Sequence, residues 1–238
     1  MKLAGQVAVV TGAGRGIGRA AALCFAREGA AVVLAARSAR ELASVAAEVE
    51  QAGGRALAVP TDVRQEPAVA ALVKRALAEY ARIDVLITAA GAAAFGPVAD
   101  SKTDDWDQML AVNLRGAVLC CRAVLPPMMA QRRGTIINIG SVVTSRTLTG
   151  SAAYTASKYG LLGFSRVLAE EMRPHGVRVG VLTAGATDTP LWDGMPDAPD
   201  RARMLRPEQV AEAALYMAAL DPNATLEELT LLPAGGIL

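Results

Sequence analysis

Tyr154 and Lys158 lie four residues apart in the stretch AAYTASKYG, within a segment whose apolar spacing predicts a helix over 153–172. This spacing places both side chains on one face of the helix. A tyrosine phenol in water titrates near pH ~10, and a neighbouring ammonium favours the phenolate and lowers its pKa. None of the other tyrosines has a lysine at this spacing, and the chain holds only four lysines. The pair therefore predicts proton exchange with a bound molecule.

A serine and an asparagine elsewhere in the chain are candidates to act with this pair. Ser141 stands just past the apolar run 135–139, in INIGSV. Its hydroxyl would hold a substrate carbonyl beside Tyr154, and a turn serine at a strand end is the alternative. Asn113 lies within a predicted helix over 104–130, where asparagine is a poor helix former. The two residues add a hydroxyl and an amide to the candidate site.

Four glycines stand in TGAGRGIGRAAA, between the apolar run 7–10 and a helix predicted from 16 onward. The amino end of a helix offers unpaired N–H groups and a partial positive charge, which suit a phosphate. Glycines let the backbone approach that phosphate and let the helix pack closely on a sheet. A tight strand–helix turn is the alternative. We predict a pyrophosphate-binding loop formed by Gly12, Gly14, Gly16 and Gly18.

Strand-like and helix-like segments alternate along the whole chain. Strands are expected at 7–10, 31–35, 56–59, 85–88, 135–139, 177–182 and 229–232, and helices at 16–28, 40–52, 67–81, 104–130, 153–172 and 208–219. The strands are continuously apolar, as strands covered on both faces should be. This pattern predicts an α/β, Rossmann-type, doubly wound parallel sheet of about seven strands with helices on both faces. Ligands bind such sheets beyond the carboxyl ends of the strands.

Composition narrows the class of protein. The chain has 238 residues, 53% of them hydrophobic, a formal net charge of +1 and no linker-like segment, which predicts one domain over 1–238. Near-neutral charge and 4% aromatic residues argue against a nucleic-acid surface. No apolar run approaches the ~18 residues of a membrane span, and no signal peptide is expected. Three cysteines without metal or redox spacing are interpreted as core residues in a cytoplasmic protein, with no metal site.

The spacing from Thr11 to Gly18 resembles that of the short-chain dehydrogenase/reductase family, and the resemblance covers nearly the whole chain. Its motifs resemble those of NADP-dependent 3-oxoacyl-(acyl carrier protein) reductase-like members. This resemblance implies a nicotinamide cofactor.

The same resemblance assigns a catalytic tetrad. The matching residues are Asn113, Ser141, Tyr154 and Lys158. It implies that Ser141 orients a carbonyl oxygen, that Tyr154 is the general acid, and that Lys158 binds the nicotinamide ribose and lowers the tyrosine pKa. Asn113 would bend its helix and hold a water that links the lysine to solvent.

The end of the second predicted strand, AVVLAARS, bears on the choice of cofactor. An acidic residue there would accept the ribose hydroxyls of NAD, whereas an arginine suits the extra phosphate of NADP. This strand ends at Ala36, followed by Arg37, and Arg15 lies in the glycine loop. The nearest acid, Glu41, belongs to the next helix. We expect NADP(H), with NAD(H) as the alternative.

The remaining cofactor contacts follow from the resemblance. Asp62 would contact the adenine, with a loop cap as the alternative. The residues expected to contact the cofactor are Gly12, Gly14, Arg15, Gly16, Ile17, Gly18, Arg37, Ser38, Asp62, Val63, Ala90, Gly91, Tyr154, Lys158, Gly185, Thr187 and Thr189. Two stretches depart from the family pattern: Thr88-Ala89-Ala90-Gly91 replaces Asn-Asn-Ala-Gly, and Ala184 replaces a proline.

The segment 188–206, rich in proline and charge, resembles the substrate lid of the family, with an irregular loop as the alternative. Leu191, Trp192 and Met195 would close over an apolar substrate. Arg132 and Arg133 would either dock acyl carrier protein, as basic residues near this position do in similar reductases, or cap a helix end.

The resemblance also implies a homo-oligomer, a tetramer or a dimer, formed by the two long helices around Asn113 and Lys158. Four apolar residues of the second helix would serve this interface or the core: Leu161, Leu162, Phe164 and Leu168.

The function that we expect is NADPH-dependent reduction of a ketone or 3-oxoacyl-type carbonyl to a secondary alcohol, with Tyr154 as general acid. One alternative is an NAD-dependent alcohol or sugar dehydrogenase, against which the missing acid at Ala36 argues. The other is a cofactor-sensing protein without turnover, against which the complete tetrad argues.

Overall fold

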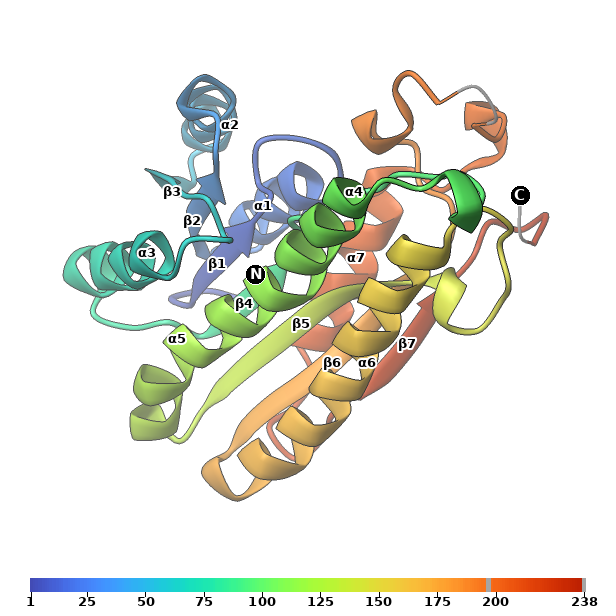
Figure 1. Ribbon diagram of the computed structural model, residues 1–238. Helices are drawn as coiled ribbons and strands as arrows, with labels where there is room; N and C mark the ends of the chain where they lie inside the picture. The colour runs from blue at the N-terminus through green and yellow to red at the C-terminus, as the bar shows by residue number, and fades with distance from the viewer. Residues whose placement is uncertain (196–197, 237–238) are drawn as a thin grey trace.

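A seven-stranded sheet forms the centre of the computed structural model, which describes residues 1–195 and 198–236 (Figure 1). Its order is β3-β2-β1-β4-β5-β6-β7, and every neighbouring pair is parallel. The strands are β1 (Val7–Thr11), β2 (Ala31–Ala36), β3 (Arg55–Pro60), β4 (Val85–Thr88), β5 (Gly134–Ser141), β6 (Val177–Ala184) and β7 (Glu228–Leu231). The predicted α/β fold is confirmed.

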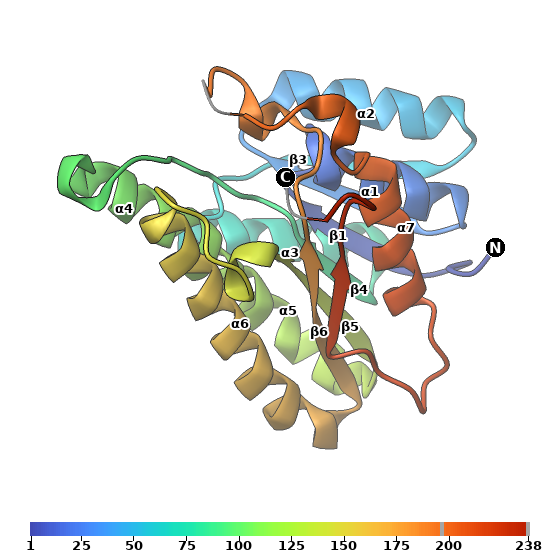
Figure 2. The same cartoon turned by 90° about the vertical axis from the view of Figure 1, so that its right-hand side faces the viewer.

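Helices cover both faces of this sheet (Figure 2). One layer holds α1 (Gly16–Arg27), α2 (Ala39–Gln51) and α7 (Pro207–Ala218); the other holds α3 (Glu66–Tyr80), α4 (Thr103–Met109), α5 (Ala117–Gln131) and α6 (Ala152–Met172). Short 3-10 turns lie at Val98–Asp100, Val142–Thr144, Arg173–His175, Pro190–Trp192 and Arg201–Arg203.

The strands are apolar on both faces because successive residues point into different layers. In β1, Ala8 and Val10 pack in the layer of α1 and α7, whereas Val7 and Val9 pack in the layer of α3 and α5. All four side chains are buried. The sheet therefore separates two apolar cores.

The carboxyl ends of the central strands share one edge of the sheet. Thr11 at the end of β1 pairs with Thr88 at the end of β4, and Ser141 of β5 pairs with Ala184 of β6. The chain order reverses between β1 and β4, so the loops that follow them diverge and leave a crevice. The structure thus gathers the loops after β1, β4, β5 and β6 around one place.

The predicted helix over 104–130 is not a uniform α-helix. The run Thr103–Gln131 consists of α4, a π-helical turn η2 (Leu110–Gly116) and α5. Such π turns are rare and frequently occur at functional sites. This one contains the buried Asn113, so the local distortion implied for that residue is present.

The same run, Thr103–Gln131, is long and apolar enough to cross a membrane by length and composition alone. The expectation that no apolar stretch approaches this length was wrong. Asn113 and two arginines interrupt the apolar run in the sequence, but the helix continues through them. The core helix of a globular protein passes the same test. This run packs against the sheet, with α3 and α6 beside it (Figure 1).

Apolar residues of α5 and α6 belong mainly to the core. Leu161, Leu162 and Leu168 are buried. Phe164 is half-buried and packs against the apolar core to which Leu168 belongs. The core alternative therefore holds for these positions. Two cysteines of α5 are buried as predicted, and the cysteine of α1 is half-buried: Cys120, Cys121 and Cys24.

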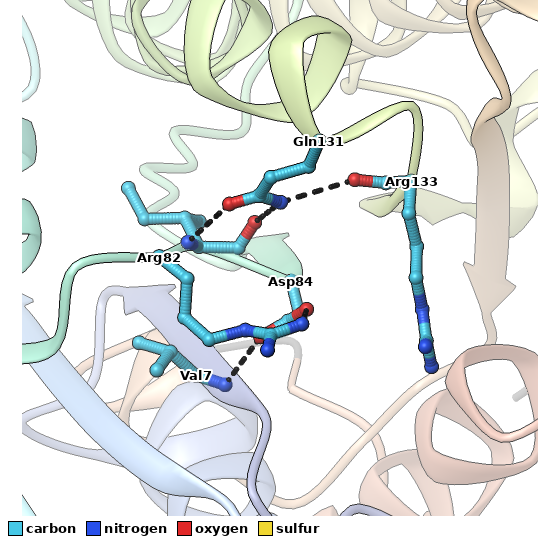
Figure 3. A network of polar contacts seen from close by, with 6 residues as sticks. Val7, Arg82, Asp84, Gln131 and Arg133 are labelled. Atoms are coloured by element: carbon cyan, nitrogen blue, oxygen red, sulfur yellow. Dashed lines mark hydrogen bonds and ion pairs between the residues drawn. The ribbon is translucent and has the colours of Figure 1, made fainter.

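At the amino ends of the strands, a polar network joins β1 to β4 (Figure 3). The buried Asp84 carboxylate accepts hydrogen bonds from the Val7 N–H at 2.9 Å and from the Arg82 guanidinium at 2.8 and 2.5 Å. The bond to this carboxylate raises the pKa of Arg82. Asp84 thus satisfies the first N–H group of β1.

Gln131, at the end of α5, extends this network (Figure 3). Its side chain accepts from the Ile83 N–H at 3.2 Å and donates to the carbonyl oxygens of Ile83 and Arg133 at 2.8 and 3.2 Å. Arg132 is the C-cap residue of α5, in the left-handed region with φ 50°. Both arginines precede β5, at the opposite end of that strand from Ser141.

Replacing the buried carboxylate should destabilise the fold. We expect Asp84→Ala to lower the free energy of unfolding by about 2 kcal/mol, because a buried N–H group loses its acceptor and Arg82 loses its counter-ion. Asp84→Asn retains an acceptor oxygen and should lose less. Urea denaturation measures the effect, with Asp107→Ala on the exposed side of α4 as the control. Equal losses in Asp84→Ala and the control would contradict the assignment.

Candidate active site

The glycine loop between β1 and α1 lies in backbone contact with its surroundings. A Cβ atom at Gly12 would stand 2.7 Å from the Ala90 nitrogen, and one at Gly18 would stand 2.3 Å from the Gly12 carbonyl oxygen. Gly12 and Gly16 also have positive φ angles of 68° and 55°. Both the backbone conformation and the close approach therefore require glycine here.

The amino end of α1 is open to an anion. Its N-cap residue, Arg15, makes no capping hydrogen bond through its side chain, and the first turn holds no acidic residue. The first N–H groups of a helix lack partners within the helix and carry partial positive charge. The loop therefore fits the pyrophosphate of a nicotinamide cofactor, as predicted from the glycine spacing.

Ser141, Tyr154 and Lys158 line one wall of a cavity of about 620 Å³ that begins at the glycine loop. The Lys158 ammonium donates a hydrogen bond to the Ile139 carbonyl oxygen at 2.9 Å and lies 5.7 Å from the centre of the Tyr154 ring. Ser141 is the last residue of β5, within hydrogen-bonding reach of the phenol. The structure thus brings together three of the four tetrad residues at the cavity.

Burial sets the pKa values of Tyr154 and Lys158. Burial raises the pKa of Tyr154, and the hydrogen bond with Ser141 opposes that rise. Burial lowers the pKa of Lys158 to about 8. In the protein without cofactor the pKa of the phenol is thus raised above its ordinary value, because desolvation outweighs the hydrogen bond with Ser141. At neutral pH Tyr154 therefore keeps its proton and can donate it. A lowering of this pKa by Lys158 in the cofactor-bound site stays a prediction.

Asn113 lies beneath the cavity and does not line it. Its Oδ1 accepts from the Ala92 N–H at 2.8 Å, and its Nδ2 donates to the Ala92 carbonyl oxygen at 2.9 Å and to the Ser157 hydroxyl at 3.0 Å. Ser157 donates in turn to the Tyr154 carbonyl oxygen at 2.7 Å. The amide therefore joins the loop after β4 to the start of α6. Holding a water stays a prediction.

Charged side chains line the cavity where β2 ends. Arg15 and Arg37 are exposed there and form no ion pair within residues 1–195 and 198–236. Ser38 is the N-cap of α2 and accepts from the Glu41 N–H at 3.2 Å. The Glu41 carboxylate lies over the glycine loop, since a Cβ at Gly14 would stand 2.7 Å from its Oε2. The sequence placed Glu41 in the next helix and offered no signal for its approach to the glycine loop.

Asp62, after β3, is held by its neighbour. The Arg64 guanidinium donates to its carboxylate at 3.0, 3.1 and 2.6 Å, and the Arg64 N–H donates at 3.0 Å. The hydrogen bond from the Arg64 side chain keeps the pKa of Asp62 low, and the charge of Arg37 adds to this effect. The loop-cap alternative therefore describes the observed bonds, and the adenine contact stays a prediction.

Hydroxyl groups replace the asparagine pair that the resembled family carries after β4. The Thr11 hydroxyl oxygen accepts from the N–H groups of Ala89 and Ala90 at 3.2 and 3.3 Å. Thr88 donates to Asn138 Oδ1 at 2.6 Å, which is the single hydrogen bond expected for it. The loop is therefore held by Thr11 and Asn138, neither of which the sequence marked as a replacement.

The loop after β6 closes against the glycine loop. A Cβ at Gly16 would stand 3.1 Å from Thr189 Cγ2, and one at Gly185 would stand 2.8 Å from Pro233 Cδ. Thr187 donates to the Gly185 carbonyl oxygen at 2.9 Å, and both threonines are buried. Both threonines line the cavity, and Thr189 does so beside the glycine loop.

An aromatic wall borders the far side of the cavity. The Phe95 and Trp192 rings stack with their centroids 5.9 Å apart and 4° between their planes, and Phe95 lies 5.9 Å from the Tyr154 ring. The Trp192 indole N–H donates to the Thr187 carbonyl oxygen at 3.0 Å. Phe95 stands in an irregular loop without a pattern of its own, so the sequence offered no signal for it.

The segment that carries Trp192 is tied at both ends by one guanidinium. Arg201 pairs with Asp188 at 2.8 Å and with Asp193 at 2.6 Å. Of the predicted lid residues, Leu191 and Trp192 line the cavity. Met195 does not, and positions 196 and 197 lie outside the described residues.

The cavity gathers nearly all of the predicted cofactor residues. Gly18 is the exception, because it packs under the loop instead of facing the cavity. The predicted residues that line it are Gly12, Gly14, Arg15, Gly16, Ile17, Arg37, Ser38, Asp62, Val63, Ala90, Gly91, Tyr154, Lys158, Gly185, Thr187 and Thr189.

Residues 6–199 match the family model described as short chain dehydrogenase. The chain belongs to this family. A 3-oxoacyl-[acyl-carrier-protein] reductase from Synechocystis sp. is 38% identical over 228 residues, which cover 93% of this chain and 92% of that protein. The crystal structure of a metagenomic short-chain oxidoreductase in complex with NADP is 38% identical, with a TM-score of 0.87 over 98% of this chain and 99% of that one. An alcohol dehydrogenase from Thermococcus sibiricus, complexed with 5-hydroxy-NADP, is 30% identical, with a TM-score of 0.89 over 96% and 97%.

The family match makes this chain a short-chain dehydrogenase-type oxidoreductase that acts on small molecules. Its resemblance to the family, first apparent in the glycine loop and the Tyr–Lys pair, is confirmed. The nicotinamide-cofactor class follows from the same match.

The buried lysine predicts a pH dependence of stability. Its pKa falls from ~10.4 in the unfolded chain to about 8 in the fold, so between these values the unfolded chain binds more protons. Lys158 should therefore contribute a rise in the free energy of unfolding of the cofactor-free protein through this window, by roughly 3 kcal/mol. The buried Cys120 and Cys121 thiols, whose pKa values burial raises, contribute in the opposite direction, so the test is a difference between variants. Lys158→Met should lack the lysine contribution, whereas Lys74→Met at the surface should keep it. Denaturant titrations at pH values across the window measure the difference, and an identical pH profile for Lys158→Met and the unmodified protein would sink the assignment.

The loop contact predicts different results for two glycine variants. Gly18→Ala should lower the free energy of unfolding by about 2 kcal/mol and weaken NADP⁺ binding, because its methyl group meets backbone that cannot give way. Gly14→Ala meets only the Glu41 side chain, which can move, and should cost less stability. Thermal denaturation and calorimetric titration measure both effects. Equal stability losses would refute the contact.

Proposed function

We propose that this protein reduces a ketone or 3-oxoacyl-type carbonyl to a secondary alcohol with NADPH as the reductant. The observation that carries the proposal is the position of Ser141, Tyr154 and Lys158 at the wall of a cavity whose other end is the open amino end of α1. When bound, the nicotinamide supplies the hydride that reduces the carbonyl carbon.

The chain's own residues then handle the carbonyl oxygen. The Ser141 hydroxyl orients that oxygen, and the Tyr154 phenol, protonated at neutral pH, donates its proton to it. Lys158, held to the Ile139 carbonyl oxygen, stabilises the resulting phenolate through its positive charge and would hold the nicotinamide ribose. Asn113 positions α6 through Ser157. General acid catalysis of this kind contributes ~10²–10⁴-fold to the rate.

The adenosine end of the cavity favours NADP(H) over NAD(H). Arg15 and Arg37 would pair with the additional phosphate, because a guanidinium binds phosphate oxygens with two parallel donors. Asp62 would contact the adenine, and Thr187 and Thr189 would hold the nicotinamide carboxamide. The similar structures from the metagenomic protein and Thermococcus sibiricus contain NADP and 5-hydroxy-NADP.

The substrate end favours a carbonyl compound with an apolar group. Phe95, Leu148, Leu191 and Trp192 line this end, and Trp192 belongs to the segment 188–206 that we propose as the lid. A similar protein is named 3-oxoacyl-[acyl-carrier-protein] reductase, which supports an acyl substrate. Acyl carrier protein as a partner has weaker support, because the expected basic residues lie at the opposite end of β5 from the cavity.

The protein is proposed to act in the cytoplasm as a homodimer or homotetramer, without nucleic-acid or membrane partners. An exposed stripe on α6 supports the oligomer: Tyr159, Gly163 and Val167 repeat at four-residue intervals, and the side chains of Tyr159 and Val167 are 52% and 59% exposed. Such a stripe on a helix beside α5 suits a partner helix of a second copy.

A second candidate function is an alcohol or sugar dehydrogenase that runs in the oxidative direction with NAD. The similarity to an alcohol dehydrogenase from Thermococcus sibiricus supports the oxidative direction but not NAD, because that structure contains 5-hydroxy-NADP. The acidic Glu41 at the cavity supports NAD. A cofactor sensor is the third, and only tight cofactor binding without turnover of any carbonyl or alcohol would favour it.

One assay separates these functions. Consumption of NADPH and of NADH is measured side by side against a panel of ketones and 3-oxoacyl thioesters, and formation of both reduced cofactors is measured against matching alcohols and sugars. We expect the fastest turnover with NADPH and a ketone or thioester bearing an apolar group. Preference for NAD⁺ and an alcohol would replace the proposal with the second candidate.

A tyrosine variant tests the mechanism in the same assay. Tyr154→Phe should lose at least ~10²-fold in kcat, because the proton donor is gone, and should bind NADP⁺ as the unmodified protein does. Tyr216→Phe, an exposed tyrosine of α7, should keep full activity. Full activity of Tyr154→Phe would reject tyrosine as the general acid.

A further inference from the structure

The corner of the cavity beside β2 carries charges of both signs. Arg15 and Arg37 are exposed cations, whereas Asp62 is already engaged by Arg64. The second acid at this corner is Glu41. Within residues 1–195 and 198–236, its carboxylate forms neither an ion pair nor a side-chain hydrogen bond.

The helix α2 holds Glu41 over the glycine loop. Ser38 caps this helix through the Glu41 N–H, which fixes the position of the residue, and its side chain is half-buried. Its Oε2 and Cβ lie 2.7 and 3.0 Å from the point that a Cβ of Gly14 would occupy. By contrast, Glu48 of the same helix is paired with Arg19. Glu41 thus presents a carboxylate, with its acceptor capacity unused, at the phosphate-binding loop.

The chemistry of a dinucleotide gives this carboxylate a ligand. When a pyrophosphate lies on the glycine loop, the adenosine ribose comes next toward the end of β2. A carboxylate accepts hydrogen bonds from ribose hydroxyls, and it repels a phosphate on that ribose. Arginines do the reverse, because they pair with the phosphate. The two kinds of group at this corner therefore act in opposite directions on the choice of cofactor.

We propose that Glu41 is a cofactor-specificity residue that binds the adenosine ribose hydroxyls of NAD(H) and opposes the phosphate of NADP(H), against Arg15 and Arg37. The corner then accepts both cofactors, and Glu41 limits its preference for NADP(H). This inference rests on the proposed function, since it requires a nicotinamide cofactor in the cavity. Glu41, in the first turn of α2, then binds the ribose hydroxyls that an acidic residue at the end of β2 would bind, since this chain has Ala36 there.

Calorimetric titration of the full chain with NADP⁺ and with NAD⁺ tests the proposal without reference to activity. Glu41→Gln should raise the ratio of NADP⁺ to NAD⁺ affinity by at least fivefold, with weaker NAD⁺ binding and tighter NADP⁺ binding. Arg37→Gln should lower the ratio by a similar factor. Glu50→Gln removes the same charge from an exposed position of α2 and should leave the ratio unchanged.

The possible results are distinguishable. An unchanged ratio in Glu41→Gln, or equal weakening of both cofactors, overturns the specificity role while the proposed function stands. Failure of the unmodified protein to bind either cofactor overturns the proposed function itself. If thermal denaturation shows that Glu41→Gln is not folded, Glu41→Ala replaces it. In addition, the affinities of the unmodified protein for adenosine 2′,5′-bisphosphate and for adenosine 5′-monophosphate are compared by competition. Comparable affinity for the two fragments supports the proposal, and a strong preference for the bisphosphate overturns it.

Discussion

The approach of Gly18 to the Gly12 carbonyl oxygen is the contact on which the site depends. It packs the first turn of α1 against the end of β1, and no side chain larger than hydrogen fits between them. With α1 in this position, its N–H groups face the cavity, Ala90 lies against one side of the loop and Thr189 against the other. The same contact thus shapes the phosphate-binding loop, which lies against the loops after β4 and β6.

Buried polar groups are placed at both ends of the sheet, with different consequences. Asp84 is fully satisfied at the amino ends of the strands, where it joins β1 and β4 (Figure 3). Lys158 is buried at the carboxyl ends with a single carbonyl oxygen as its acceptor among the described residues, and its pKa is lowered to about 8. The hydrogen-bonded network around Asp84 stabilises the fold, whereas the Lys158 ammonium keeps N–H donors that a ligand can bind.

The departures from the family pattern are compensated by contacts from other strands. Thr11 of β1 holds the two N–H groups of the loop after β4, and Asn138 of β5 binds Thr88. The π turn brings Asn113 beneath the same loop, where its amide bonds both backbone groups of Ala92. A loop that lost two side-chain amides is therefore held from three sides.

The sequence by itself determined the order of strands and helices, the glycine loop, the Tyr154–Lys158 pair and thereby the family, because periodicity and short spacings express local backbone geometry. Of the 17 residues that the family resemblance implied as cofactor contacts, 16 line the cavity, and Gly18 supports the loop from beneath. Tertiary structure alone decided the contacts between distant segments: Phe95 on Trp192, Thr11 on the loop after β4, and Glu41 over Gly14. It also decided that the pKa of Tyr154 is raised in the protein without cofactor, because desolvation depends on everything packed around the phenol.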